Sequence, residues 1–367
     1  MKLTKYQLFW LLFSMEMGMT LLITINPTFK IARQGAPLAT LLAGAASLII
    51  TYIAIKLSLL YPDQTFIEYV PRIIGKWLGK AIVFAYLLMW IIVAGIILRQ
   101  YADFVHLTLF VTTPLWVIIL FMLLVIVYAV HGGIHIVGRC SEIIGPIVIF
   151  NVLLYRLLSI KDLRIERLFP LLPTTGWMPV LKGSIPTISF LSESVMIVML
   201  IAFLTEKKKA VSSSLWGVGI AAVIIVSTTI DVLLLMDNTL PGKLQNPIYS
   251  FSQYISVLEF IQNLDSVLVV GVSFTVFVKA CLYIFMASYG TAQLFHIRKW
   301  RYLLWVVGTL VFVIAIFPRN VDQAEVAFPT FWKNVILPCF LIAIPVLLWM
   351  IGTVKKRMKR IEQPKAP

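Results

Sequence analysis

An acidic side chain stands in the middle of an apolar stretch that is long enough to cross a bilayer. The stretch covers residues 183–204, and a spanning helix takes roughly 20 residues. Glu193 lies near its centre, where an ionisable group costs on the order of 3 kcal/mol and therefore normally faces a protein interior or a wet cavity. Ser189, Ser192 and Glu193 follow the i, i+3, i+4 spacing, which places them on one face of a helix.

The same stretch contains Pro186, which removes a backbone donor and tends to kink or break a helix. A broken helix with a polar face at membrane depth is typical of a small-molecule site. The alternative is that these polar groups hydrogen-bond to a neighbouring helix and hold two helices together. The stretch alone leaves both interpretations open.

The first apolar run repeats this pattern. It places the carboxylate of Glu16, the flexible backbone of Gly18 and the hydroxyl of Thr20 at mid-membrane, with Met19 between the last two. Glycine weakens helix continuity, and a threonine hydroxyl can satisfy freed backbone groups. In a chain of ten spans divided into two halves of five, this run opens the first half and the Glu193 run opens the second. Interrupted helices at matching positions indicate a substrate site in inverted-repeat transporters.

The composition excludes a soluble domain. Of the 367 residues, 60% are hydrophobic and only 13% are charged, with a mean hydropathy of +0.95. Too little polar surface remains to cover a soluble protein of this size, so the chain is predicted to be an all-α polytopic membrane protein. The net charge of +15 is distributed between apolar runs, which favours membrane topology and a lipid environment over nucleic-acid binding.

Ten spans are predicted in one integral membrane domain that covers residues 1–367. Basic residues are about twice as numerous in the segments on the N-terminal side of the membrane as in those opposite, so both termini are predicted to be cytoplasmic. The first run is interpreted as a retained span, because no small-residue cleavage site follows it. The predicted spans are about 6–25, 36–60, 79–105, 114–131, 134–159, 184–204, 211–236, 264–294, 301–317 and 333–354.

Other side chains lie where they would reach a site between the first and sixth spans. Tyr86 and Trp90 are one turn apart, a spacing that serves packing or ligand contact. Ser273 in the eighth span is expected to reach a ligand. Lys279 either supplies a fixed cation beside the site or extends its ammonium group to the interface, and we favour the second interpretation.

Two further patterns are interpreted as structural. Arg139 and Glu142 have i, i+3 spacing, so they are predicted to form an ion pair near the inner face. His131 and His135 have the spacing of metal ligands, but two glycines interrupt the helix between them and no carboxylate completes a zinc motif. No nucleophile–base pair stands out, so we expect no metal, no cofactor and no enzymatic activity.

Several short motifs follow one another along the chain. They are Tyr61-Pro62 followed by Ile74-Gly75-Lys76, Gly138-Arg139 with Glu142 and Pro146, Phe169-Pro170 before Glu193, and the run from Phe260 to Ser266. Their order and spacing resemble the B subunit of the spore germinant receptors, a family within the amino acid–polyamine–organocation superfamily of transporters, over essentially the whole chain. Members of that family usually carry a basic residue just before the leucine and aspartate of the last motif, where this chain has Asn263.

The resemblance implies a LeuT-like bundle of ten helices, with broken first and sixth helices that hold a nutrient, often an amino acid. It also implies a complex with an A and a C subunit in the spore inner membrane. A sensor of this kind would bind a ligand carboxylate at the backbone N–H groups of residues 18–20 and an ammonium group at Glu193 or at unwound carbonyls. The alternatives are an amino-acid transporter and a scaffold subunit that binds no ligand.

Overall fold

The computed structural model describes residues 1–170, 176–254 and 265–362. Within these ranges the chain is almost entirely helical, apart from an isolated backbone bridge between Leu3 and Leu204. Seven helical stretches are long and apolar enough to cross a membrane, and Leu115–His131 and Trp300–Ile316 are shorter apolar helices. Most of the last resemblance motif, residues 260–264, lies outside the described residues.

Each predicted span contains a helix. The first and sixth spans are interrupted, and the last begins with two π-helical segments. The first span continues through Pro27 to Ala32, seven residues beyond its predicted end. In chain order the spanning elements are α1 (Lys5–Met17) with α2 (Thr20–Ala32), α3 (Ala36–Leu59), α5 (Lys76–Thr108), α6 (Leu115–His131), α7 (Ile134–Ser159), α8 (Trp177–Leu191) with η3 (Ser192–Met196), α9 (Ile197–Leu200) and η4 (Ile201–Phe203), α10 (Ala210–Met236), α12 (Asp265–Leu294), α13 (Trp300–Ile316), and η6 (Gln323–Ala327), α14 (Phe328–Phe331), η7 (Trp332–Ala343) and α15 (Ile344–Glu362).

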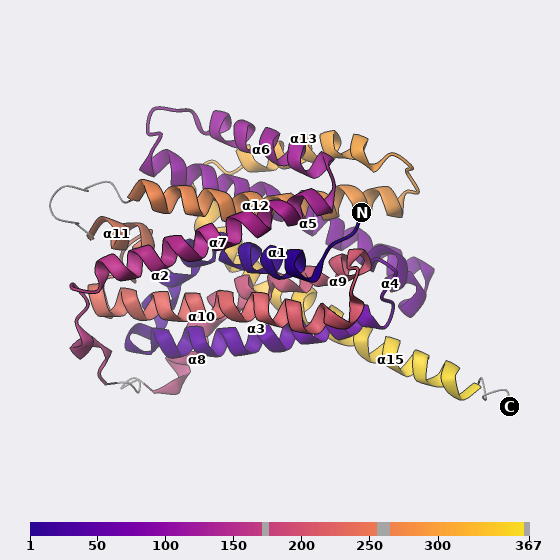
Figure 1. Cartoon of the computed structure of the whole chain (residues 1–367), viewed down its shortest axis with the longest axis horizontal. Helices are drawn as coiled ribbons and strands as arrows, with labels where there is room; N and C mark the ends of the chain where they lie inside the picture. Colours follow the sequence, from indigo (N-terminus) through magenta and orange to yellow (C-terminus); the bar gives the residue numbers. More distant parts are fainter. Residues whose placement is uncertain (171–175, 255–264, 363–367) are drawn as a thin grey trace.

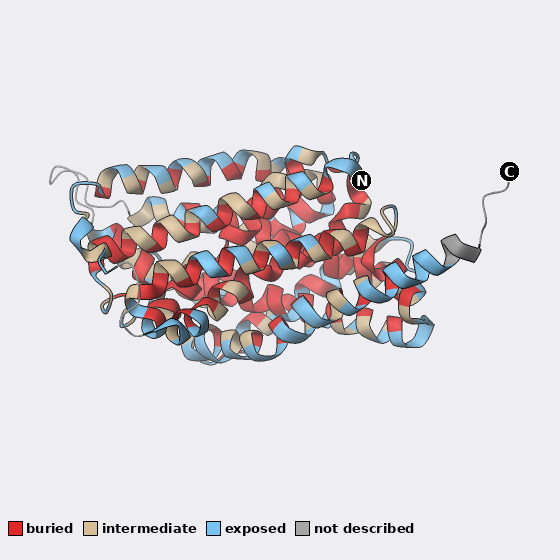
Figure 2. Cartoon of the chain, turned by 90° about the horizontal axis from the view of Figure 1, so that it is seen from below, coloured by how far each residue is buried: buried red, intermediate tan, exposed pale blue. Residues whose placement is uncertain are grey.

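Short helices connect these elements at the two ends of the bundle. They are η1 (Arg33–Gly35), α4 (Phe66–Ile74), η2 (Ile165–Leu168), η5 (Lys207–Lys209) and α11 (Pro247–Tyr254). Figure 1 shows the long helices side by side, with α1 within the bundle and the end of α15 extending away from it. In Figure 2, buried residues fill the centre of the bundle and exposed residues follow its outer helices. The apolar side chains on these outer helices face the surroundings, as expected of a protein in lipid.

The first span breaks between Met17 and Thr20. Gly18 has an extended backbone, and Met19 adopts the left-handed conformation with φ of 64°, which is strained for a residue with a side chain. A Cβ atom at Gly18 would lie 3.1 Å from the carbonyl oxygen of Thr275 and 3.2 Å from Cδ of Lys279. A side chain at position 18 would therefore force α12 to shift by a few tenths of an ångström, because this helix approaches the backbone of the break closely.

The second break lies after Pro186. The sequence predicted a kink or a break at this proline, and a break at the proline itself does not occur. α8 continues through this proline to Leu191 and gives way to the 3₁₀ segment η3. A proline removes only one helical hydrogen bond, and neighbouring helices can hold a transmembrane helix together around it. The hydroxyl of Ser194 donates to the carbonyl oxygen of Leu191 over 3.0 Å. Serine side chains compete in this way with the regular backbone bonds of a helix.

Substitution of Gly18 by alanine should destabilise the protein, whereas Gly219→Ala should not. The alanine methyl group at position 18 would be forced against Thr275 and Lys279, and overpacking of this kind costs about 1–3 kcal/mol. At Gly219, the nearest atom lies 3.9 Å from a built Cβ, an ordinary contact within a helix. Scanning fluorimetry of the purified protein in detergent should show a lower Tm for Gly18→Ala alone. Equal Tm values for the two variants would contradict a close approach at Gly18.

Candidate functional site

One buried ammonium group joins the two helix breaks. Nζ of Lys279, in the middle of α12, lies 3.2 Å from Oε2 of Glu193 in η3. The same nitrogen donates a hydrogen bond of 3.1 Å to the carbonyl oxygen of Gly18 at the end of α1. It also lies 5.4 Å from the ring centre of Phe190 at the end of α8. A carboxylate, a backbone carbonyl and an aromatic face together enclose the cation, and we call this arrangement the ammonium cage.

The interpretation that Lys279 extends to the membrane interface is wrong. Its side chain is completely buried, and that of Glu193 is 3% exposed. A lysine extends toward water when no partner compensates its charge, whereas here the opposite charge lies within hydrogen-bond distance. The structure instead places Lys279 as a buried cation between the two helix breaks. That a ligand binds beside this cation stays a prediction.

Tyr283 completes the surroundings of Glu193. It lies one turn after Lys279 in α12, and its hydroxyl donates a hydrogen bond to the Glu193 carboxylate. The i, i+4 spacing of these two residues could have indicated the contact, because such residues share a helix face. Trp332 of η7 bonds to the backbone shortly before the second break: its Nε1 donates to the carbonyl oxygen of Ser189 over 2.8 Å. Sequence reasoning missed Tyr283, Phe190 and Trp332.

A second carboxyl group faces the cage without a hydrogen bond. Glu16, in the last turn of α1, is fully buried, and neither of its carboxyl oxygens has a hydrogen-bond partner among the described residues. It interacts electrostatically with both Lys279 and Glu193, and the backbone N–H of Ser194 faces it outside hydrogen-bond geometry. The cluster therefore sets two carboxyl groups against one ammonium group in a region of low dielectric constant, where unbalanced charge is costly.

The two aromatic candidates lie beside this cluster. Tyr86 and Trp90 of α5 border a cavity of about 10 Å³ together with Glu193, Tyr283 and Trp332. The Tyr86 hydroxyl donates to the carbonyl oxygen of Phe340, and both candidate rings are almost completely buried. Such a volume holds about one water molecule and no nutrient, so the centre of the bundle is occluded in this conformation.

The hydroxyl candidates of the two breaks bond mainly to nearby groups. Thr20 donates to the carbonyl oxygen of Glu16 over 2.5 Å, and Ser189 donates to that of Pro186 over 2.6 Å. The Ser192 hydroxyl lies 3.4 Å from that of Ser47 in α3. The first two bonds lie within the interrupted spans, and only the contact between Ser192 and Ser47 joins a break to a neighbouring helix, the structural role that the sequence left open. Met19 instead lines a separate cavity of about 40 Å³ between α2, α7 and α12.

Ser273 does not lie at the site. It is on the opposite face of α12 from Thr275, because residues two apart on a helix point in nearly opposite directions. Its hydroxyl donates to the carbonyl oxygen of Val269 over 2.7 Å and accepts a bond of 3.1 Å from the Tyr101 hydroxyl.

Arg139 and Glu142 form no ion pair within 4.0 Å, whereas several other pairs in the described part of the chain do. Arg139 is exposed on the outer side of α7, where solvent competes for its charge. Glu142 instead accepts a hydrogen bond of 3.4 Å from Gln7. The predicted pair is therefore absent from this conformation.

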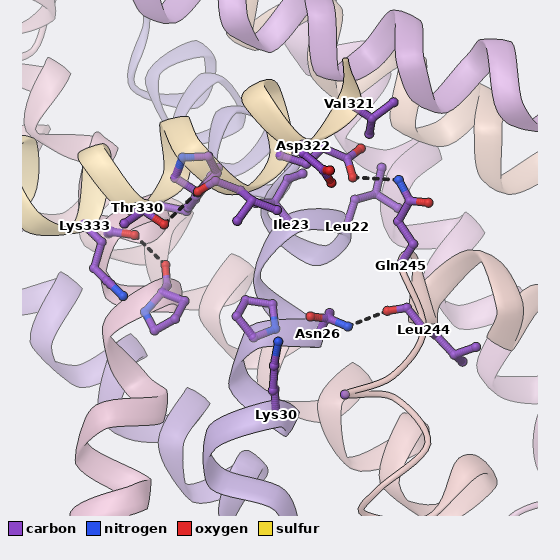
Figure 3. A pocket seen from close by; sticks show the side chains of 18 of the residues that line it. Leu22, Ile23, Asn26, Lys30, Leu244, Gln245, Val321, Asp322, Thr330 and Lys333 are labelled. Atoms are coloured by element: carbon purple, nitrogen blue, oxygen red, sulfur yellow. Dashed lines mark hydrogen bonds between the residues drawn. The ribbon is translucent and has the colours of Figure 1, made fainter.

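A wide vestibule leads from one end of the bundle toward the breaks. Its volume is about 770 Å³, which is within the range of small-molecule sites. The walls come from α2, from the end of α8, from residues 242–245 and from residues 320–333. Figure 3 shows Leu22 and Asn26 of α2 facing this space, with Gln245 across from them. Phe190 lines the vestibule and also contacts Lys279, so its ring separates the vestibule from the ammonium cage.

At the opposite end of the bundle, backbone hydrogen bonds join the start of the first span to the end of the sixth. The backbone N–H of Leu3 donates to the carbonyl oxygen of Phe203 over 2.8 Å, and that of Thr205 donates to Leu3 over 2.9 Å. Nζ of Lys5 lies 3.6 Å from Oε2 of Glu206. These contacts hold the start of the first span against the end of the sixth. The site therefore has an open vestibule on one side and a closed connection on the other.

Solved transporter structures share this architecture. The nucleobase-cation-symport-1 family transporter MHP1, in a closed conformation with bromovinylhydantoin bound, matches with a TM-score of 0.75 at 11% identity, over 99% of this chain and 80% of that chain. MhsT in complex with L-phenylalanine matches with a TM-score of 0.61 at 12% identity, over 96% of this chain and 99% of that one. The protein thus has the LeuT-like fold of integral membrane transporters, as the family resemblance implied.

Sequence comparison narrows the class to a family. A family model described as "Spore germination protein" matches residues 2–324. Spore germination protein YndE of Bacillus subtilis (strain 168) is 30% identical over 327 residues, or 87% of each chain. Spore germination protein KB of the same organism is 25% identical over 362 residues, or 96% of this chain and 95% of that protein. The chain belongs to the spore germination protein family, and the resemblance inferred from its motifs is confirmed.

Removal of one partner of the buried pair should destabilise the protein more than removal of both charges. Lys279→Met leaves the Glu193 carboxylate buried without its cation, a change that typically costs about 3–5 kcal/mol. Adding Glu193→Gln removes the uncompensated charge, so we expect the double variant to regain part of the lost Tm. Lys182→Met, at an exposed lysine of α8, is the matched control. An unchanged Tm for Lys279→Met would contradict the ammonium cage.

Proposed function

We propose that this protein is the nutrient-sensing subunit of a spore germination receptor. In this proposal it binds an amino acid between the broken first and sixth helices and signals to A and C subunits. It resides in the spore inner membrane with both termini in the cytoplasm, and it catalyses no reaction. The observation that carries the proposal is the ammonium cage, because one side chain of α12 ties together the breaks of both helices.

The groups at the two breaks suit the two ends of an amino acid. The first N–H groups of a helix have no helical partner, so the start of α2 at Thr20 offers donors to a carboxylate. Glu193 and the carbonyl oxygen of Gly18 suit an ammonium group, but Lys279 already occupies both. A nutrient ammonium group would therefore reach them by displacing the ammonium group of Lys279.

Displacement of Lys279 supplies a route from binding to signal. A ligand shifts a conformational equilibrium only through its different affinities for the two states. The cage holds α1, η3 and α12 in one arrangement, and a nutrient that replaces its internal cation favours an arrangement in which these helices are no longer tied. The partner subunits would respond to that change in the positions of the helices.

The vestibule and the closed inner side are also compatible with an amino-acid transporter of the same superfamily, the main alternative. A transporter must close the vestibule and open the inner side in each cycle, with Glu16, Glu193 or Lys279 as the coupling group. A scaffold subunit that binds no nutrient is the second alternative. It predicts that no substitution at the two breaks alters the nutrient response.

Glu193→Gln should abolish the germination response to nutrient at normal protein levels. The amide keeps the size of the side chain but removes the charge that binds the ammonium group of Lys279 or of a nutrient. The measurement is a dose–response curve of spore germination with L-alanine, alongside an immunoblot of spore membranes. Glu142→Gln, at a carboxylate of α7 remote from the cage, is the matched control. The sensing proposal fails if the response is unchanged in both Glu193→Gln and Gly18→Ala.

The same preparation separates sensing from transport. Vesicles that contain the purified protein, with or without its partner subunits, would be tested for uptake of radiolabelled L-alanine. A sensor binds the amino acid without accumulating it inside the vesicles, whereas accumulation above that of empty vesicles identifies a transporter.

A further inference from the structure

The vestibule gathers charged side chains of both signs from distant parts of the chain. Three lysines line it: Lys30 of α2, Lys243 of the segment after α10, and Lys333 of η7. Asp322 and Glu325 line it as well, so ammonium groups outnumber carboxyl groups by three to two. In Figure 3 the side chains of Lys30 and Lys333 extend into the same space from different helices, with Asp322 across it.

These lysines lie on walls that hydrogen bonds hold in place. The side-chain amide of Asn26 donates to the carbonyl oxygens of Pro241 and Leu244, which fixes the segment that carries Lys243 against α2. Nε2 of Gln245 donates to Oε2 of Glu325 over 3.0 Å, and this bond joins the same segment to the last span. The vestibule is therefore a braced structure that positions its charged groups.

None of the three lysines has a counter-ion in the part of the chain that the structure describes. Lys5, Lys207 and Lys279 each lie within 4.0 Å of a carboxylate, whereas Lys30, Lys243 and Lys333 do not, although two carboxyl groups line the same cavity. The three lysines outnumber the two carboxyl groups around this concave space, and an excess of positive charge attracts anions. In the orientation proposed above the vestibule opens to the outside, where basic residues are otherwise disfavoured, so membrane topology does not account for them.

The floor of the vestibule argues for recognition of an anion rather than a cation. Phe190 forms part of this floor, and the ammonium group of Lys279 lies directly behind its ring. Behind the floor, Glu193 and the Gly18 carbonyl are already occupied by that lysine. Of the two carboxyl groups on the walls, that of Glu325 accepts a hydrogen bond from Gln245. The three ammonium groups have no counter-ion among the described residues, and ammonium groups bind carboxylates.

We propose that the vestibule is an entrance site that binds the carboxylate group of small solutes through Lys30, Lys243 and Lys333. This site is separate from the helix breaks, and it deepens the proposed function by naming the chemical group that selects solutes before they reach the ammonium cage. Solutes of the same size that lack a carboxylate are not retained there.

Three matched probes test this recognition on the full purified chain in detergent. L-alanine carries both a carboxylate and an ammonium group, propionate carries only the carboxylate, and L-alaninamide carries only the ammonium group. Equilibrium binding is measured for each probe by isothermal titration at low and high salt. We expect L-alanine and propionate to bind, with affinity that falls as salt screens the lysines, and L-alaninamide to bind far more weakly.

Substitutions locate the bound carboxylate. Each of Lys30→Gln, Lys243→Gln and Lys333→Gln should weaken propionate binding by about threefold, and the triple variant by more than about tenfold, as expected for partly exposed charge pairs. The corresponding arginine variants should retain binding. Lys182→Gln, at an exposed lysine outside the vestibule, should have no effect.

Several results would overturn the carboxylate site: no propionate binding, L-alaninamide binding equal to that of propionate, or full propionate binding in the triple variant. These outcomes are independent of the germination assay. If propionate binding fails these tests while Glu193→Gln still abolishes germination, the vestibule proposal is wrong and the sensing proposal stands. If propionate binding passes these tests while substitutions at the breaks leave germination unaffected, the vestibule proposal stands and the sensing proposal is wrong.

Discussion

The ammonium group of Lys279 places a strong constraint on the centre of this protein. It lies in a region without solvent, so its charge must be compensated by groups within a few ångströms. The Glu193 carboxylate and the Gly18 carbonyl meet this requirement, and both residues belong to the interrupted part of a helix. The two breaks and the buried lysine therefore depend on one another, and a change in one alters the energy of the others.

The helix breaks also bear on how this structure compares with other proteins of the same fold. A helix break in the membrane leaves backbone groups without partners, which must be satisfied by protein, water or a ligand. Here an internal side chain satisfies part of that requirement, in a fold that is shared with MhsT, a protein solved in complex with L-phenylalanine. The vestibule is open on one side of the bundle, and the N-terminal contacts close the other side. A solute would shift such an arrangement only by binding one conformation better than another.

Much of this architecture could be predicted from the sequence. Hydropathy located the spans because each requires a long apolar run, and Glu193 and Gly18 marked the breaks because charge and glycine are unfavourable inside such helices. Periodicity indicates which residues share a helix face, but not which helix lies opposite. For this reason the burial of Lys279, the position of Ser273 and the missing pair of Arg139 and Glu142 required the packed bundle.

The vestibule could not be predicted from the sequence for a related reason. Its walls come from segments separated by more than two hundred residues, and each of its lysines resembles an ordinary loop or helix-end residue when considered alone. Pro186 illustrates a different difficulty, since the same residue breaks an isolated helix and is tolerated in one that neighbouring helices support.

The central claim is that Lys279 and Glu193 are paired at rest and separate when nutrient binds. Solid-state NMR of the purified receptor in lipid, with ¹⁵N-labelled lysine and ¹³C-labelled glutamate, measures the dipolar coupling between the Lys279 ammonium nitrogen and the Glu193 carboxyl carbon. The Lys279→Met spectrum identifies the signal. We predict a strong coupling without nutrient, as the 3.2 Å contact requires, and its loss with saturating L-alanine. A coupling that is absent at rest, or unchanged when nutrient is bound, would contradict the account.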